Sequence, residues 1–112
     1  MFLLLYHLTI AQTEIALDSV SHYIGYDIKV CDKVYSTYQS TNPNRITYIN
    51  FGGKYPNHTF SVIVFPKDLE NFDYIPSEYL KGKNICVTGL ATEYHGKPQI
   101  VATHESQITV TE

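Results

Sequence analysis

Residues 46–65, ITYINFGGKYPNHTFSVIVF, decide the fold expected for this chain. Both ends of the stretch are rich in β-branched and aromatic residues, which favour β-strands. The middle, GGKYPNH, contains two glycines that permit positive φ angles and a proline that fixes φ and lacks an N–H donor. Gly52 ends the first apolar run and Pro66 ends the second. The stretch therefore predicts two strands joined by a reversal, the central hairpin of a small closed sheet.

Length and composition suit one globular domain, which we expect over residues 12–112. The chain has 112 residues, of which 44% are hydrophobic and 17% charged, so it is neither disordered nor fibrous. It contains 10 Tyr, 5 Phe and no Trp, so much of its apolar surface carries hydroxyl groups that need water or a partner. The net charge of −3 argues against a general polyanion binder.

The charges are unevenly spread along the chain. Residues 28–65 carry four basic side chains against the single acid Asp32, whereas residues 66–79 carry four acids against the single base Lys67. The basic group is Lys29, Lys33, Arg45 and Lys54, and the acidic group is Asp68, Glu70, Asp73 and Glu78. This asymmetry indicates a basic side of the domain, and the alternative is that both groups are ordinary solvated faces.

Residues 1–11, MFLLLYHLTIA, form a short apolar run. Small residues at positions 9 and 11 match the cleavage pattern of a signal peptide, which predicts a mature chain that starts at Gln12. No Lys or Arg follows Met1, so the basic start of such a peptide would be missing. The alternative is an N-terminal strand or helix packed on the domain. The run is shorter than the about 20 residues that a membrane span needs, so no stable membrane insertion is expected.

The remaining elements are short. Helices are expected at residues 17–23, ended by Gly25, and at residues 66–72, begun by Pro66. Alternating patterns predict strands at 27–35, 84–94 and 99–103, with a polar loop at 36–44, a linker at 75–82, a tight turn at 95–98 and an edge extension at 107–110. The order is helix, then three strands, then helix, then two strands. We therefore expect an all-β fold with short helices, namely a five-stranded Greek-key barrel whose helix lies between strands three and four.

Three stretches carry a resemblance to a known class of domain. They are IKVCDKV after Ile24-Gly25, YINFGGKYPNHTFSVIVF, and YLKGKNICVTGLATEYHGKPQIV. Over about residues 19–108 the chain resembles small bacterial OB-fold (oligonucleotide/oligosaccharide-binding) domains, found alone or attached to exported nucleases and DNA-binding proteins. It departs from the pattern at Asp32, where glycine is common. OB folds serve many functions, so the resemblance implies the fold more strongly than the activity.

The resemblance implies a binding surface on the outer face of strands two and three, flanked by the loops after strands one and four. Exposed aromatic rings there stack on bases while basic groups hold phosphates. The positions that match are Tyr48, Asn50 and Phe65 on the face, Tyr35, Tyr38 and Arg45 beside the first loop, Tyr94, His95 and Lys97 beside the second, and Lys54 and Tyr55 at the hairpin tip. The alternative is that these tyrosines simply cover the barrel.

The two cysteines are expected to form a disulfide bond. By alternation Cys31 and Cys86 lie on the outer side of strands one and four, and those strands are neighbours in an OB barrel. An exported protein would meet the oxidising compartment in which such a bond persists. The alternative is two free thiols in a cytoplasmic protein. We expect a periplasmic or secreted protein if the N-terminal segment is a signal peptide, and a cytoplasmic protein otherwise.

The chain offers no recognisable catalytic motif. No Ser-His-Asp, H-E-x-x-H or C-x-x-C spacing occurs, and the single arginine, Arg45, is too little for nuclease chemistry. His58, His95 and His104 have no metal-ligand spacing. We therefore expect no enzyme activity, no metal and no cofactor. The expected partner is single-stranded nucleic acid. The alternative partners are another protein domain, if the chain is a structural module of the cell envelope, or an oligosaccharide.

Overall fold

The computed structural model describes residues 13–41, 45–53 and 57–111 of the chain. Its strands are β1 (Thr13–Glu14), β2 (Asp27–Lys33), β3 (Ser36–Gln39), β4 (Thr47–Phe51), β5 (Phe60–Val64), β6 (Asn84–Tyr94), β7 (Lys97–Val101) and β8 (Ile108–Val110). The 3₁₀ helices are η1 (Leu17–Tyr23), η2 (Pro66–Asn71) and η3 (Glu105–Gln107), and α1 (Pro76–Tyr79) is a single α-helical turn. The all-β fold with short helices is confirmed. The predicted signal peptide, residues 1–11, lies outside the described residues.

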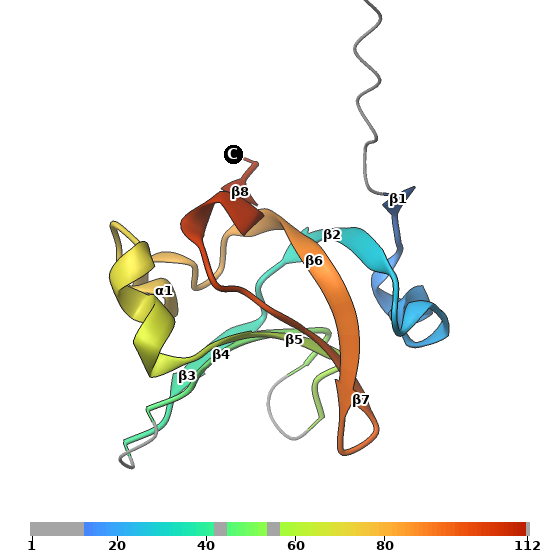
Figure 1. Ribbon diagram of the computed structural model, residues 1–112, viewed down its shortest axis with the longest axis horizontal. Coiled ribbons are helices and arrows are strands. Elements are labelled where there is room, and N and C mark those ends of the chain that lie inside the picture. The colour runs from blue at the N-terminus through green and yellow to red at the C-terminus, as the bar shows by residue number, and fades with distance from the viewer. Residues whose placement is uncertain (1–12, 42–44, 54–56, 112) are drawn as a thin grey trace, which may run out of the picture.

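The strands form one open, mixed sheet in the order β1-β2-β6-β7-β5-β4-β3, with β8 added beside β6. The predicted hairpin is confirmed, because β4 pairs antiparallel with β5. The pairs β1–β2 and β5–β7 are parallel, and the pairs β2–β6, β3–β4, β6–β7 and β6–β8 are antiparallel. In Figure 1 the long strand β6 runs between β2 and β7, and η2 and α1 follow one another at one side of the strands. A closed five-stranded barrel is not confirmed by this strand order.

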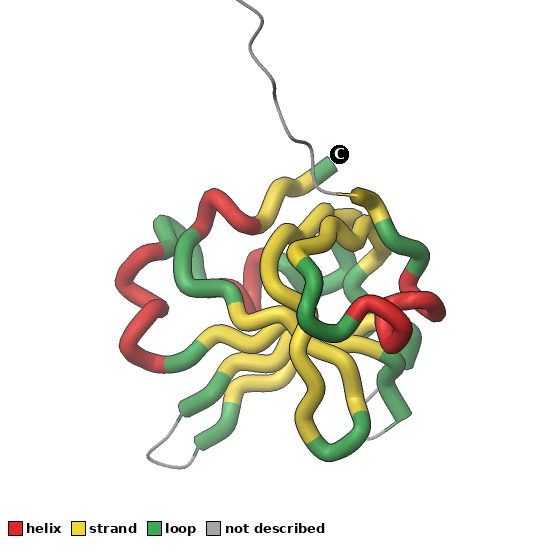
Figure 2. Tube along the Cα trace, turned by 45° about the vertical axis from the view of Figure 1, so that its right-hand side comes forward, coloured by secondary structure: helices red, strands yellow, loops and turns green. Residues whose placement is uncertain are grey.

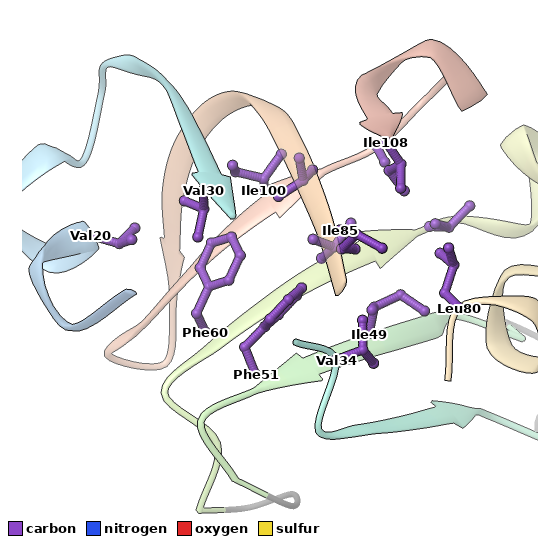
Figure 3. Packing of buried hydrophobic residues seen from close by; sticks show 14 of the residues in the cluster. Val20, Val30, Val34, Ile49, Phe51, Phe60, Leu80, Ile85, Ile100 and Ile108 are labelled. Carbon is purple, nitrogen blue, oxygen red and sulfur yellow. The ribbon is translucent and has the colours of Figure 1, made fainter. Parts of the chain in front are cut away.

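Apolar side chains from every long strand meet in one core. Figure 2 shows the strands as a curved layer with the helical segments to its sides, and Figure 3 shows the residues enclosed by it. Phe51 and Phe60 lie opposite one another in β4 and β5, and their ring centroids are 5.5 Å apart. The alternating residues Ile85, Val87 and Ala91 of β6 are all buried and form its inner face. Burial of these side chains is the main favourable contribution to folding.

Gly89 of the long strand β6 makes room for a side chain from β7. Its φ angle is +156°, and a Cβ atom at this position would lie 2.6 Å from Cγ2 of Ile100. Such a contact is too short for a Cβ atom, so glycine at this position leaves room for the buried side chain of Ile100.

β7 covers Lys97–Val101 instead of the predicted residues 99–103. Two other segments form an element where a loop or a linker was predicted. Residues 36–39, expected in a polar loop, form β3, because pairing with β4 satisfies their backbone groups and sets Tyr38 against Tyr48. Residues 76–79, expected in a linker, form α1, which begins at Pro76 and ends at Tyr79, directly before the fully buried Leu80. In both cases tertiary contacts outweigh a weak local preference.

The disulfide bond between Cys31 and Cys86 is confirmed. The two residues are direct partners in the β2–β6 ladder, as the alternation predicted. Both side chains are half-buried on the outer side of the sheet, whereas their neighbours Val30 and Val87 point into the core.

Candidate functional site

A row of polar side chains crosses the outer face of five strands. Ser36 lies opposite Asn50, which lies opposite Ser61, which lies opposite Gln99, which lies opposite Thr92. Since side chains alternate between the two faces of a strand, residues in register share one face. The strand register, rather than proximity in sequence, therefore assembles this row.

Asn50 is the centre of the row and is only 1% exposed. Its side-chain Nδ2 donates to Oγ of Ser36 at 3.4 Å, and its Oδ1 accepts a hydrogen bond from Oγ of Ser61 at 2.7 Å. The prediction that Asn50 points out to meet a ligand is wrong in this respect. It lies on the outer face, but its neighbours cover it and use its hydrogen-bonding groups within the protein, as buried amides require.

A second row on the same face is aromatic and apolar. Tyr38 lies opposite Tyr48, which lies opposite Ile63, which lies opposite Val101. The rings of Tyr38 and Tyr48 are 6.1 Å apart between centroids and tilted by 34°. Tyr38 is 55% exposed and Tyr48 is half-buried, so the two rings support each other and both remain accessible to solvent.

The outer face contains a hollow with a volume of about 220 Å³ that is lined by residues of both rows and by the turn after β6. We call it the outer-face hollow. Its lining is Tyr48, His58, Ser61, Ile63, Tyr94, His95, Lys97, Pro98 and Gln99. Four residues that the sequence assigned to a binding surface, Tyr48, Tyr94, His95 and Lys97, are thus brought to one place from β4, from the two strands β6 and β7, and from the turn between them.

The turn between β6 and β7 shapes one side of the hollow. His95 and Gly96 have φ angles of +50° and +78°, as a tight hairpin turn with two positive φ angles requires. The rings of Tyr94 and His95 are 4.2 Å apart and nearly perpendicular, and Tyr94 is 64% exposed. Lys97 lies opposite Tyr94, and its Nζ donates to the carbonyl oxygen of His58 at 2.7 Å. That bond fixes the lysine charge at the edge of the hollow.

The other predicted site residues lie elsewhere. Tyr35 is highly exposed in the bend between β2 and β3, and Arg45 is exposed just before β4. Phe65 follows the last residue of β5, is half-buried at the start of η2, and does not line the hollow. The prediction that Phe65 is an exposed centre of the face is therefore wrong, because the chain leaves the sheet one residue earlier. Lys54 and Tyr55 lie outside the described residues.

His58 and Gln99 line the hollow but were not selected from the sequence as binding residues. The pairing of β5 with β7 sets Gln99 opposite Ser61, so both side chains lie on the outer face. Alternation along β7 could have identified Gln99 only if this pairing had been known. His58 precedes β5 in an irregular segment, where no periodicity indicates its direction.

A second hollow, of about 390 Å³, lies by η2 and α1. It is lined by Gln39, Leu69, Phe72, Asp73, Tyr74, Ile75 and Pro76. Burial, with smaller contributions from Glu105 and Tyr79, raises the pKa of Tyr74 to about 12, so its phenol stays protonated at neutral pH. Four of the chain's acids, Asp68, Glu70, Asp73 and Glu78, lie in the segment that contains η2 and α1, which makes this side a poor surface for a polyanion.

Burial, reinforced by the charge of Lys97, lowers the pKa of His58 below its ordinary value. In the unfolded chain His58 binds a proton at about pH 6.5. Between that pH and the lower folded pKa, the unfolded state holds more protons, so the free energy of unfolding decreases as the pH falls. We expect urea unfolding at pH 7.5, 6.5 and 5.5 to show this decrease, and His58→Gln to show a smaller one. Equal slopes in the two proteins would contradict the assignment.

The described residues contain no group of three or more His, Cys, Asp or Glu side chains placed to hold a metal ion. In the same part of the chain, no helix is long and apolar enough to cross a membrane.

The fold and the outer-face hollow define a small all-β domain with an aromatic recess on one face of its sheet. Solved structures share this fold at low sequence identity. A chain assigned as an aspartyl-tRNA synthetase from Leishmania major Friedlin matches 98% of this chain with a TM-score of 0.57 and 10% identity, and this chain spans only 23% of its length. The OBody AM1L10, solved bound to hen egg-white lysozyme, matches with a TM-score of 0.53 and 13% identity, over 82% of this chain and 84% of the OBody. No protein-family model matches the sequence, and no curated protein matches it.

Proposed function

We propose that the sheet is an OB-type barrel whose first strand is bent in the middle. β2 and β3 lie at different places in the strand order, yet they are separated only by Val34 and Tyr35. The N–H of Val34 donates to the carbonyl of Lys83, and the next N–H, of Tyr35, donates to the carbonyl of Asn50. One continuous segment therefore bonds toward β6 at its start and toward β4 at its end. This supports a five-stranded barrel of residues 27–39, β4, β5, β7 and β6.

We infer that the outer face of this barrel binds single-stranded nucleic acid without catalysis. The observation that carries the proposal is the convergence of Tyr48, Tyr94, His95 and Lys97 on one hollow. Aromatic rings offer stacking surfaces to bases, and a lysine ammonium attracts the phosphate backbone. An enclosed cavity of about 150 Å³ holds one benzene ring, so a recess of about 220 Å³ has room for a nucleobase.

The exposed ring of Tyr38, next to Tyr48, would extend the surface beyond the hollow. A strand crossing the sheet could stack one base near the hollow and the next near Tyr38. The likeness to part of an aspartyl-tRNA synthetase, an enzyme whose name includes a nucleic acid, also favours this class of ligand. The disulfide bond is compatible with a protein that works after export.

The affinity should be low. The net charge of −3 opposes the approach of a polyanion. Stacking contributes about 1–3 kcal/mol per base, so one or two aromatic platforms give micromolar or weaker binding.

A second candidate function is docking of another protein. The OBody with a similar fold was solved bound to a protein, lysozyme. Exposed tyrosines suit protein interfaces as well as bases, because they combine a large apolar ring with a hydroxyl. Docking of this kind would depend much less on salt than binding to phosphates does.

Tyr48→Ala should weaken binding of a fluorescently labelled single-stranded oligonucleotide about tenfold, the low end of one lost stacking contact. Arg45→Ala should weaken binding at low salt but change it little at high salt, because salt screens an ion pair and leaves stacking intact. Fluorescence anisotropy at two salt concentrations measures both effects.

Tyr26→Ala is the matched control, because Tyr26 is 65% exposed but does not line the hollow. Its affinity should equal that of the wild type. If the oxidised wild-type protein binds no oligonucleotide at low salt, the nucleic-acid proposal fails and protein docking becomes the better account.

A further inference from the structure

We propose that the outer-face hollow selects bases that carry an exocyclic amino group beside an unprotonated ring nitrogen, namely cytosine and adenine. The inference rests on the proposed nucleic-acid function and adds a specificity to the same site. Two polar residues of the hollow, Ser61 and Gln99, carry it, and they are direct partners in the parallel pair of β5 and β7.

Ser61 is only 3% exposed but, unlike Asn50, it lines the hollow, where its oxygen offers an acceptor. A serine hydroxyl has one proton to donate and two lone pairs to accept with. Ser61 donates its proton to Oδ1 of Asn50 at 2.7 Å, and Asn50 is itself oriented by donating Nδ2 to Ser36. The Ser61 oxygen can therefore only accept a further hydrogen bond. It attracts an N–H group and repels a carbonyl oxygen.

Gln99 presents a donor and an acceptor at fixed spacing. Its side chain is half-buried at the hollow, and within the described residues its amide forms no hydrogen bond. Its backbone carbonyl accepts from Thr92, which holds the β7 backbone in position beneath the amide. A planar amide of this kind bonds a base edge through two parallel hydrogen bonds.

The two residues together match one edge pattern. The amino group of cytosine or adenine has two N–H bonds, one for Oε1 of Gln99 and one for Oγ of Ser61, while the adjacent ring nitrogen accepts from Nε2 of Gln99. Uracil places a carbonyl oxygen where cytosine has the amino group. Gln99 could reverse its amide to suit uracil, but the Ser61 oxygen would then face another oxygen with no proton between them, which is unfavourable in a partly desolvated site.

The test uses labelled pentamers of deoxycytidine and deoxyuridine, which share a backbone and differ only at the base edge. At pH 7.5 and low salt, fluorescence anisotropy should give the wild type about tenfold tighter binding of the deoxycytidine pentamer, the low end of the discrimination expected from a bidentate contact. Gln99→Leu should remove this preference by weakening binding of the deoxycytidine pentamer. Ser61→Ala, checked for folding by urea unfolding, should also reduce the preference. Gln39→Leu is the matched control, because Gln39 lines the other hollow, and it should keep the preference.

The outcomes separate the two proposals. Equal wild-type affinity for the two pentamers would overturn base selection and leave nucleic-acid binding standing. A preference for cytosine that survives in both Gln99→Leu and Ser61→Ala would overturn the assignment to these residues. Failure of both pentamers to bind would refute the proposed function, and the base selection that rests on it.

Discussion

Replacing both cysteines by alanine should lower the free energy of unfolding by about 4 kcal/mol. Cys31 and Cys86 are 55 residues apart in sequence, and β3, β4, β5, η2 and α1 all lie between them. A cross-link that closes so long a loop removes many conformations from the unfolded chain, which raises the free energy of the unfolded state. Alanine is the suitable replacement because it leaves no free thiol. Urea unfolding of the oxidised wild type and of the double variant measures the difference.

Reduction of the wild-type protein is the independent control, and it should lower the stability by a similar amount. Each single variant should fall by nearly as much as the double variant, since loss of either sulfur opens the loop. A decrease of less than about 1 kcal/mol in the double variant would mean that the bond restricts the unfolded chain only slightly, contrary to the loop-closure argument.

Phe60→Ala should cost about 3–5 kcal/mol, as expected for a fully buried aromatic side chain. Phe60 is 0% exposed, and its ring lies against that of Phe51 and near Val30 in the interior of the curved sheet (Figure 3). Removing the ring loses apolar burial and leaves a cavity that β-strands held by ladder hydrogen bonds cannot fully close. Urea unfolding measures the loss.

Phe60→Leu is the control, because it keeps much of the apolar volume and should cost clearly less than the alanine variant. A domain of this size has a total stability of about 5–15 kcal/mol, so Phe60→Ala is expected to bring the protein close to unfolding. If alanine and leucine cost the same small amount, the pair Phe51–Phe60 is not the tightly packed centre of the core.

Local sequence determined the strands with the strongest patterns. The predicted hairpin over residues 46–65 appears as β4 and β5, and the predicted strand at residues 84–94 is β6 with the same bounds. The helix predicted at residues 17–23 is also present, although as a 3₁₀ helix. Alternation of apolar and polar residues, with glycine and proline at the ends, encodes these elements because both signals act within a few residues. The same alternation placed Cys31 and Cys86 on one side of neighbouring strands.

Elements with weak local signals were not predicted. Residues 36–39 read as a loop because serine, threonine and glutamine have no apolar periodicity, yet β4 supplies a pairing partner that makes them β3. The four residues of α1 are too few for a helical pattern to show in the sequence.

The candidate site was decided only by the tertiary structure. The sequence indicated that exposed tyrosines and basic residues share one face, but Asn50 turned out to be buried and Phe65 lies beyond the end of β5. Gln99 comes to lie beside Ser61, 38 positions earlier in the chain, through the parallel pairing of β5 with β7. Strand register is set by the packing of the whole core, so which outer-face side chains meet in a hollow cannot be read from any single stretch of sequence.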